Sequence, residues 1–317
     1  MTDTQNEVFK TPVNKIRLFE HGAPGSQNLK LTRKYYTEDM LDGRVKHIVQ
    51  NITDPDIVPY IPDGIGNSTD RQRIPAVLII PGGAFRRLVY NFEGEDVAKW
   101  LNSMGIAAFV LECRLPSDEH DNAEDVPLID AMRAMRVIRG RAQEFGIDEA
   151  KIGVMGFSAG GFMAALLSTA YESDVYADYK YKDEYDKLSA RPDFAVCSYP
   201  VISIDDCIEA GKRYMSEEQV LERISDGKAK ILHKYNPDKL VRPDMPPVFI
   251  CETDDDRTTL SENSVGFYMA ARKAGVSAEL HIFRTGGHGY GCGDDFAQTG
   301  EWKVLFTKWI KSIGIIS

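Results

Sequence analysis

The sequence predicts an α/β fold in which a mostly parallel, doubly wound sheet is covered by helices on both faces. Short, nearly continuous apolar runs alternate with amphipathic helical patterns over most of the 317-residue chain. Apolar runs of this kind are typical of parallel strands that are buried on both faces. The alternation implies right-handed crossovers that return the chain to the same sheet.

The individual elements follow from the spacing of the apolar residues. Amphipathic helices are expected around residues 97–104 and 128–135, because apolar side chains recur there at i, i+3, i+4 and i+7. An additional strand is expected at 47–53. The core strands are expected at 76–80, 106–111, 152–157, 194–199, 248–251 and 280–283.

Two regions depart from the alternation. Residues 1–44 are polar and irregular, and we expect a partly ordered N-terminal arm before a domain that spans 45–317. The charged segments 171–193 and 207–240 interrupt the α/β pattern. We expect them to form an insertion of cap helices, at about 171–240, over the carboxyl edge of the sheet.

Composition excludes several classes of function. The formal net charge is −10 and no basic stripe is present, so we expect no nucleic-acid partner. No apolar run approaches 18 residues, so we expect no membrane span. Five cysteines without CxxC spacing, and a polar N-terminus without a signal-peptide core, favour a cytoplasmic location. The sequence predicts no metal or organic cofactor and gives no indication of an oligomeric state.

The strongest motif is Gly156-Phe157-Ser158-Ala159-Gly160, which matches G-x-S-x-G. An expected strand precedes it and a helical pattern at 162–170 follows it. Side chains at positions 156 and 160 would collide with the neighbouring backbone in so tight a turn. The turn would hold Ser158 in a strained conformation, with its hydroxyl exposed above the sheet as a nucleophile. A glycine-rich turn with an incidental serine is the alternative, which the flanking strand and helix disfavour.

A serine nucleophile also needs donors for the developing oxyanion, a base and an acid. Pro81-Gly82-Gly83-Ala84 directly follows a core strand, so the Gly83 amide can join the Ala159 amide as a donor. His288 lies in a glycine-rich loop after the last strand, where it can reach Ser158 as the base. The acid is expected among Asp254, Asp255 and Asp256, which follow the strand at 248–251 and precede His288 in the chain order that this fold requires.

Together these motifs resemble the esterase/lipase branch of the α/β-hydrolases that includes acetyl-xylan esterase-like and carbohydrate acetylesterase-like proteins. The resemblance runs from about residue 58 to 312. The matching blocks are 81–85, 92–95, 100–111, 114–116, 146–148, 153–161 and 286–290.

The resemblance also chooses among the aspartates. Aligned on Pro246-Pro247 and on Glu262-Asn263-Ser264, the catalytic Asp of similar proteins falls on Asp256, with Asp255 as the runner-up. Three departures from the family pattern remain. Ala84 stands where glycine is frequent, Thr258-Thr259 replaces valines, and Glu252 stands where histidine is common.

The resemblance therefore implies an α/β-hydrolase that acts as a serine esterase on a small-molecule ester. Short-acyl esters, above all acetyl esters, are the expected substrates, with acetylated sugars among them. Tyr199 and Tyr290 are expected to line the substrate pocket, although core packing explains Tyr199 equally well. The alternatives are an arylformamidase or small-peptide hydrolase with the same triad, and a non-catalytic ligand-binding protein of the same fold.

Overall fold

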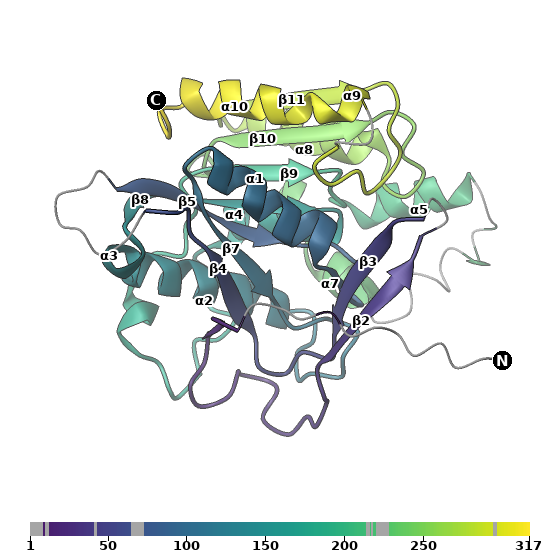
Figure 1. Cartoon of the computed structure of the whole chain (residues 1–317). Helices are drawn as coiled ribbons and strands as arrows, with labels where there is room; N and C mark the ends of the chain where they lie inside the picture. Colours follow the sequence, from purple (N-terminus) through teal and green to yellow (C-terminus); the bar gives the residue numbers. More distant parts are fainter. Residues whose placement is uncertain are drawn as a thin grey trace.

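A computed structural model describes residues 9, 13–40, 43–64, 73–213, 216, 218–219, 228–293 and 297–317. Its centre is an eight-stranded sheet with helices on both faces (Figure 1). The strand order is β1-β4-β7-β5-β8-β9-β10-β11. The strands are β1 (Ile16–Arg17), β4 (Asp56–Tyr60), β5 (Ile74–Ile80), β7 (Ala107–Glu112), β8 (Ile147–Phe157), β9 (Ala195–Ser198), β10 (Val248–Thr253) and β11 (Ala278–Phe283).

The six predicted core strands are all present and form the parallel part of the sheet, from β7 to β11. Only β4 and β1, at the other edge, pair antiparallel. Strands β7, β9 and β10 are buried along their whole length, which is why they appear in the sequence as unbroken apolar runs. The mostly parallel, doubly wound architecture that the sequence predicts is confirmed.

Helices α1 (Asp96–Ser103) and α10 (Trp302–Ser312) cover one face of the sheet. The Trp100 ring lies 4.9 Å from the Trp302 ring and 5.4 Å from the Phe306 ring, which holds these two helices together. Helices α2 (Val126–Gly140), α4 (Ala159–Ala170) and α8 (Ser261–Lys273) cover the opposite face. The shorter helices are η1 (Asn91–Glu95), α3 (Ala142–Phe145), η2 (Glu184–Lys187), α5 (Ile204–Lys212), α7 (Lys228–Lys234), η3 (Pro237–Lys239) and α9 (Ala297–Gly300).

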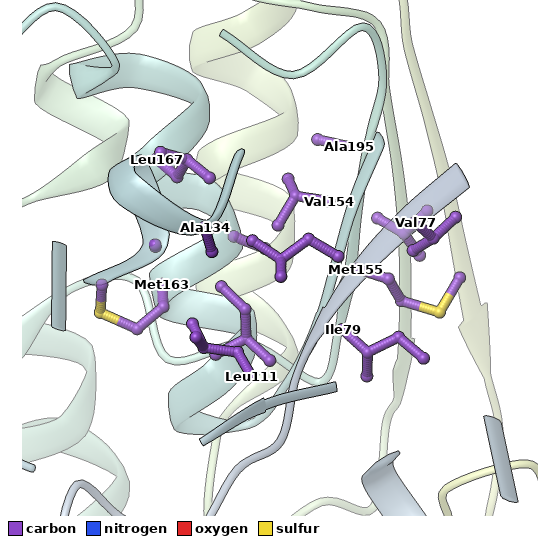
Figure 2. Packing of buried hydrophobic residues seen from close by; sticks show 14 of the residues in the cluster. Val77, Ile79, Leu111, Ala134, Val154, Met155, Met163, Leu167 and Ala195 are labelled. Atoms are coloured by element: carbon purple, nitrogen blue, oxygen red, sulfur yellow. The ribbon is translucent and has the colours of Figure 1, made fainter. Parts of the chain in front are cut away.

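The core beneath the site is built by alternation along the strands. In Figure 2, Val154 and Met155 are neighbours on β8 but lie on different sides of the sheet. Met163 and Leu167 of α4 pack on the side of Val154. The start of α4, and with it the position of Ser158, is therefore fixed by packing against the buried second half of β8 (152–157).

A second, three-stranded antiparallel sheet lies beside the first and contains β2 (Lys34–Asp39), β3 (Val45–Gln50) and β6 (Leu88–Val89). Strands β2 and β3 form the purple hairpin of Figure 1. Strand β3 is the strand that the sequence predicts at 47–53, shifted by two to three residues. Strand β6 connects this small sheet to the loop that follows β5.

The described part of residues 1–44 is not a separate arm but belongs to the domain. This part contributes β1 and β2, and its Leu18 and Phe19 lie in the main core. Its charges are paired with the sheet: Arg33 contacts Glu112 at 2.7 Å and Asp56 at 2.6 Å. The polar composition suggested a solvated segment because the acidic partners lie far away in the sequence. Residues 1–8, 10–12 and 41–42 lie outside the described residues.

The described part of the expected cap insertion, 171–240, flanks strand β9. Its first half packs on α2, where Arg133 pairs with Asp186 of η2 at 3.0 Å. Its second half, with α5, α7 and η3, contacts α8 and α4. Residues 214–215, 217 and 220–227 lie outside the described residues. Among the helices that the structure describes, none is long and apolar enough to cross a membrane.

Candidate active site

Ser158 occupies the turn between β8 and α4 with φ 53° and ψ −119°. This backbone conformation is strained for a residue with a side chain, and such strain is typical of functional sites. The turn is possible only with glycine at two positions. A Cβ atom on Gly156 would lie 1.9 Å from the carbonyl oxygen of Gly160, and one on Gly160 would lie 2.0 Å from that of Ile80. The strand–turn–helix geometry expected from the sequence is present.

The structure brings Ser158, His288 and Asp256 into one hydrogen-bonded chain. His288 Nε2 lies 2.8 Å from Ser158 Oγ, and His288 Nδ1 lies 2.6 Å from Asp256 Oδ2. Ser158 is 8% exposed and Asp256 is 3% exposed. A serine hydroxyl, an imidazole and a buried carboxylate in this order can remove the serine proton and stabilise the imidazolium that results.

The surroundings of Asp256 keep its carboxylate ionised. Its Oδ1 accepts hydrogen bonds from the Thr258 amide (2.7 Å) and the Thr259 amide (2.9 Å). Thr259 Oγ1 donates a third, to Oδ2, at 3.0 Å. Burial alone would raise the pKa of Asp256, but the hydrogen bond to His288 and the charge of that histidine outweigh it. The pKa is therefore lower than usual, with the two backbone amides adding to the effect.

The other two aspartates have different places. Asp255 Oδ1 accepts hydrogen bonds from the amides of Gly286 (2.9 Å) and Gly287 (2.8 Å), so it holds the loop that carries His288. Asp254 is exposed at the end of β10. Neither carboxylate is the hydrogen-bond partner of His288 in this structure.

Glu252 lies buried behind Asp256. Its carboxyl group accepts hydrogen bonds from the Thr253 amide (2.9 Å) and from Ser264 Oγ (3.2 Å). Burial, and secondly the negative charge of Asp256, raise the pKa of Glu252 well above its ordinary value. The pKa values of two neighbouring carboxyl groups are thus shifted in opposite directions. The site favours the charged form of Asp256 and disfavours that of Glu252.

The loop after β5 lies beside Ser158. Gly83 has φ 140°, and a Cβ atom there would lie 2.0 Å from the carbonyl oxygen of Arg87. Ala84 (φ 57°) and Phe85 (φ 60°) continue the loop in left-handed conformations, where glycine would avoid the steric cost. Gly83 and Ala159 border a common small cavity. The sequence predicts the amides of Gly83 and Ala159 as oxyanion donors. They come from the loop after β5 and from the start of α4, which meet next to Ser158.

A pocket of about 230 Å³ opens in front of Ser158. It lies between the β2–β3 hairpin, the loop after β5, η1 and the histidine loop. Its lining residues are Met40, Arg44, Lys46, Gly83, Ala84, Arg87, Val89, Phe92, Glu93, Ser158, Thr258, His288 and Gly289. The described residues of 171–240 do not reach it, so the expected cap is corrected: within the described part of the chain, the N-terminal hairpin supplies that wall. The sequence hides this role because the hairpin is more than a hundred residues from the serine.

The expectation that Tyr199 and Tyr290 line the pocket is also corrected. Tyr199 is fully buried and Tyr290 is 4% exposed, and the two rings lie against each other with centroids 4.5 Å apart. The Tyr199 ring also packs under His288, at 5.0 Å. Tyr199, at the carboxyl end of β9, therefore supports the histidine from behind, and Tyr290, in the loop after β11, packs against Tyr199.

Tyr199 and Glu93 form a bridge that sequence reasoning missed. Glu93 Oε2 accepts a hydrogen bond from the Gly82 amide (2.8 Å), and its Oε1 accepts one from Tyr199 Oη (2.9 Å). Tyr199 Oη in turn accepts a hydrogen bond from the Gly291 amide at 3.0 Å. The bridge joins the loop after β5 to the histidine loop. Its signal in the sequence was the block 92–95, to which no role was given.

We expect Tyr199→Phe to lower kcat about tenfold and to destabilise the fold. The change leaves the buried Gly291 amide without its acceptor and Glu93 Oε1 without its donor. An unpaired buried group costs about 1–3 kcal/mol. Urea unfolding and steady-state kinetics would measure both effects. Tyr171→Phe is the matched control, since it removes a hydroxyl that bonds Asp244 at 2.8 Å, far along α4 from Ser158. A Tyr199→Phe protein that loses no more activity than this control would show that the bridge does not contribute to catalysis.

The described residues contain no group of three or more His, Cys, Asp and Glu side chains arranged to hold a metal ion. The thiols of Cys113, Cys197 and Cys251 are buried and unpaired with one another in the core. Burial raises the pKa of the Cys197 thiol above its usual range, so these cysteines serve packing rather than chemistry.

Comparison with known proteins places the chain in a family. The BD-FAE family matches residues 65–270. An acetylxylan esterase of Xylanibacter ruminicola is 31% identical over 240 residues, which are 75% of this chain but 45% of that protein, so the chain spans less than half of this relative. An acetyl ester-xyloside bifunctional hydrolase from Caldicellulosiruptor lactoaceticus is 38% identical, with a TM-score of 0.67 over 84% of this chain and 91% of that one.

A more distant structure agrees in fold. A thermophilic esterase from Thermogutta terrifontis, solved with propionate bound, is 24% identical, with a TM-score of 0.64 over 93% of this chain and 96% of that one. The strand order, the serine turn and the family match agree with one another. The chain belongs to the BD-FAE family and has the α/β-hydrolase fold.

Proposed function

We propose that the protein is a serine carboxylesterase that hydrolyses short-acyl esters, and that acetylated sugars are its substrates. Ser158 is the nucleophile, His288 the general base and Asp256 the acid that orients it. The observation that carries the proposal is the continuous hydrogen-bonded chain from Ser158 through His288 to Asp256 at a strained strand–helix turn. A hydroxyl held in this way serves chemistry rather than packing.

The reaction proceeds in two acyl transfers. His288 Nε2 takes the hydroxyl proton of Ser158 while Oγ forms a bond to the ester carbonyl carbon. The amides of Gly83 and Ala159 donate hydrogen bonds to the resulting oxyanion. His288 then gives its proton to the alcohol oxygen, the carbon–oxygen bond breaks, and the alcohol leaves an acyl-enzyme. Water, deprotonated by His288, repeats the sequence and releases the carboxylic acid.

The choice of sugar acetates rests on two supports. Two of the relatives reported above are named an acetylxylan esterase and an acetyl ester-xyloside bifunctional hydrolase. The pocket in front of Ser158 holds about 230 Å³, less than the 300–1,000 Å³ of typical drug-sized ligand sites, and charged side chains line much of it. A small pocket with charged side chains in its wall suits a sugar with a short acyl group better than a fatty chain.

A series of nitrophenyl esters tests the acyl preference. We expect acetyl and propionyl esters to have kcat/KM values at least tenfold above that of the octanoyl ester. A long chain would displace water from polar side chains without replacing the hydrogen bonds that the water makes. Acetylated xylosides and N-formylkynurenine in the same panel distinguish an esterase from an arylformamidase. Faster turnover of octanoyl esters, or of the formamide, would contradict the proposal.

A further inference from the structure

The pocket in front of Ser158 gathers positive charge that the hydrolysis of a neutral acetyl ester does not need. Its wall contains three basic side chains, Arg44, Lys46 and Arg87. The chain as a whole has a net charge of −10. The local charge at the mouth of the site is therefore opposite in sign to that of the protein, and clefts with one sign of charge concentrate ligands of the other sign.

All three basic residues belong to the small sheet or its connections. Lys46 lies on β3, Arg44 immediately precedes that strand, and Arg87 precedes β6. Two of them are held in place: Arg87 Nη1 contacts Glu38 Oε1 at 2.5 Å, and the Arg44 guanidinium lies 5.2 Å from the centre of the Phe92 ring. An arginine has five N–H donors, so one contact to Glu38 leaves Arg87 able to bind a second anion.

Glu93, the acidic side chain among the described residues of the pocket wall, does not cancel this charge. Glu93 is 5% exposed, and its two oxygens already accept hydrogen bonds from Gly82 and Tyr199 on the protein side. Burial raises the pKa of Glu93. Its carboxyl group is thus directed into the bridge behind the pocket, while the lysine and the arginines border the open space.

We propose that the alcohol part of the substrate carries a carboxylate, so that the pocket takes an acetyl ester of an acidic sugar, a uronic acid. The inference rests on the proposed function, because an acyl group as small as acetyl leaves the remaining volume of the pocket to the alcohol. Lys46 supplies a point charge, and Arg87 supplies the planar fork that matches a carboxylate. A neutral sugar would offer these two groups no further negative charge.

Two substrates that differ in one group test the proposal: the methyl glucoside and the methyl glucuronoside, each acetylated at the same hydroxyl. We expect kcat/KM to be at least tenfold higher for the glucuronoside at low salt. Salt screens such attraction, so this ratio should fall toward one in 0.5 M NaCl. The measurement uses the unmodified protein and depends on no variant.

Variants then locate the charge. We expect Lys46→Met to lower the glucuronoside-to-glucoside ratio severalfold, and Lys46→Met with Arg87→Met to bring it close to one. Lys308→Met, on the exposed side of α10, is the matched loss of one lysine charge and should leave the ratio unchanged. Lys46→Gln is a second, milder variant should the double variant fold poorly.

The outcomes separate the two levels of proposal. Equal kcat/KM for the two esters, or a preference that survives in the Lys46 variants, would overturn the acidic-sugar inference while leaving the esterase function in place. Failure to hydrolyse either ester, together with failure on nitrophenyl acetate, would instead remove the proposed function. A third substrate, the glucoside hemisuccinate, checks the acyl side. Its kcat/KM is compared with that of the glucoside acetate. If this ratio exceeds the ratio found for the glucuronoside acetate, the carboxylate belongs on the acyl group and the inference is wrong.

Discussion

Ser158→Ala should lower kcat on nitrophenyl acetate by about 10⁴-fold or more, the scale of loss found when the nucleophile of a serine triad is removed. The residual rate reflects substrate binding and the oxyanion donors, which the substitution leaves in place. The fold should be unaffected, because alanine fits the same space. The hydrogen bond described above for Ser158 Oγ is the one to the partly exposed imidazole of His288. Stopped-flow or endpoint hydrolysis with a matched urea unfolding curve would measure both.

Ser168→Ala is the control for this experiment. It removes a hydroxyl from the same helix, α4, where Ser168 Oγ donates to the carbonyl oxygen of Ala164 at 2.7 Å. Its activity should remain within about twofold of wild type. A folded Ser158→Ala protein with more than a tenth of wild-type activity would refute the assignment of the nucleophile.

Asp256→Asn should be nearly as severe, with a loss of about 10⁴-fold in kcat, as when the acid of a serine triad is replaced by its amide. The amide removes the counter-charge of the imidazolium. It also favours the wrong imidazole tautomer, because an Asn that turns its NH₂ group to Nδ1 leaves the proton on Nε2. The amides of Thr258 and Thr259 can still bond its carbonyl oxygen, so the loop should keep its shape.

The neighbouring aspartates provide graded comparisons. Asp254→Asn should be mild, since that side chain is exposed. Asp255→Asn can keep its hydrogen bonds to Gly286 and Gly287 through the amide oxygen, so its loss should stay within about tenfold. Asp255→Ala should cost more, through the position of the histidine loop. A dead Asp255→Asn variant beside an active Asp256→Asn variant would assign the acid to Asp255 instead.

Much of the site could be anticipated because its constraints are local. Gly156 and Gly160 are required by contacts within the turn itself, so five adjacent residues define the position of Ser158. The choice among Asp254, Asp255 and Asp256 is of another kind. All three share the same chemistry and the same strand end, and only the rotation of the chain after β10 decides which carboxylate faces His288. Alignment to similar proteins favoured Asp256, and the structure pairs this residue with the histidine.

The tyrosines show where local reasoning fails. An aromatic residue at a strand end can face a pocket or the interior, and the two places have the same sequence pattern. Tyr199 faces the interior because its hydroxyl donates a hydrogen bond to the carboxyl group of Glu93. Glu93 lies more than a hundred residues earlier in the chain. Thr259 was noted only as a departure from valine, yet its hydroxyl and amide both bind Asp256.

The sequence by itself determined the parallel core and the serine turn, since burial on both faces produces unbroken apolar runs and a tight turn admits only glycine at fixed spacings. Tertiary structure alone decided what surrounds them. The N-terminal segment became part of the domain through ion pairs such as Arg33 with Glu112, whose partners lie in different elements. The same long-range pairing puts the β2–β3 hairpin beside Ser158. Contacts of this kind depend on how distant surfaces pack together, and no window of neighbouring residues contains them.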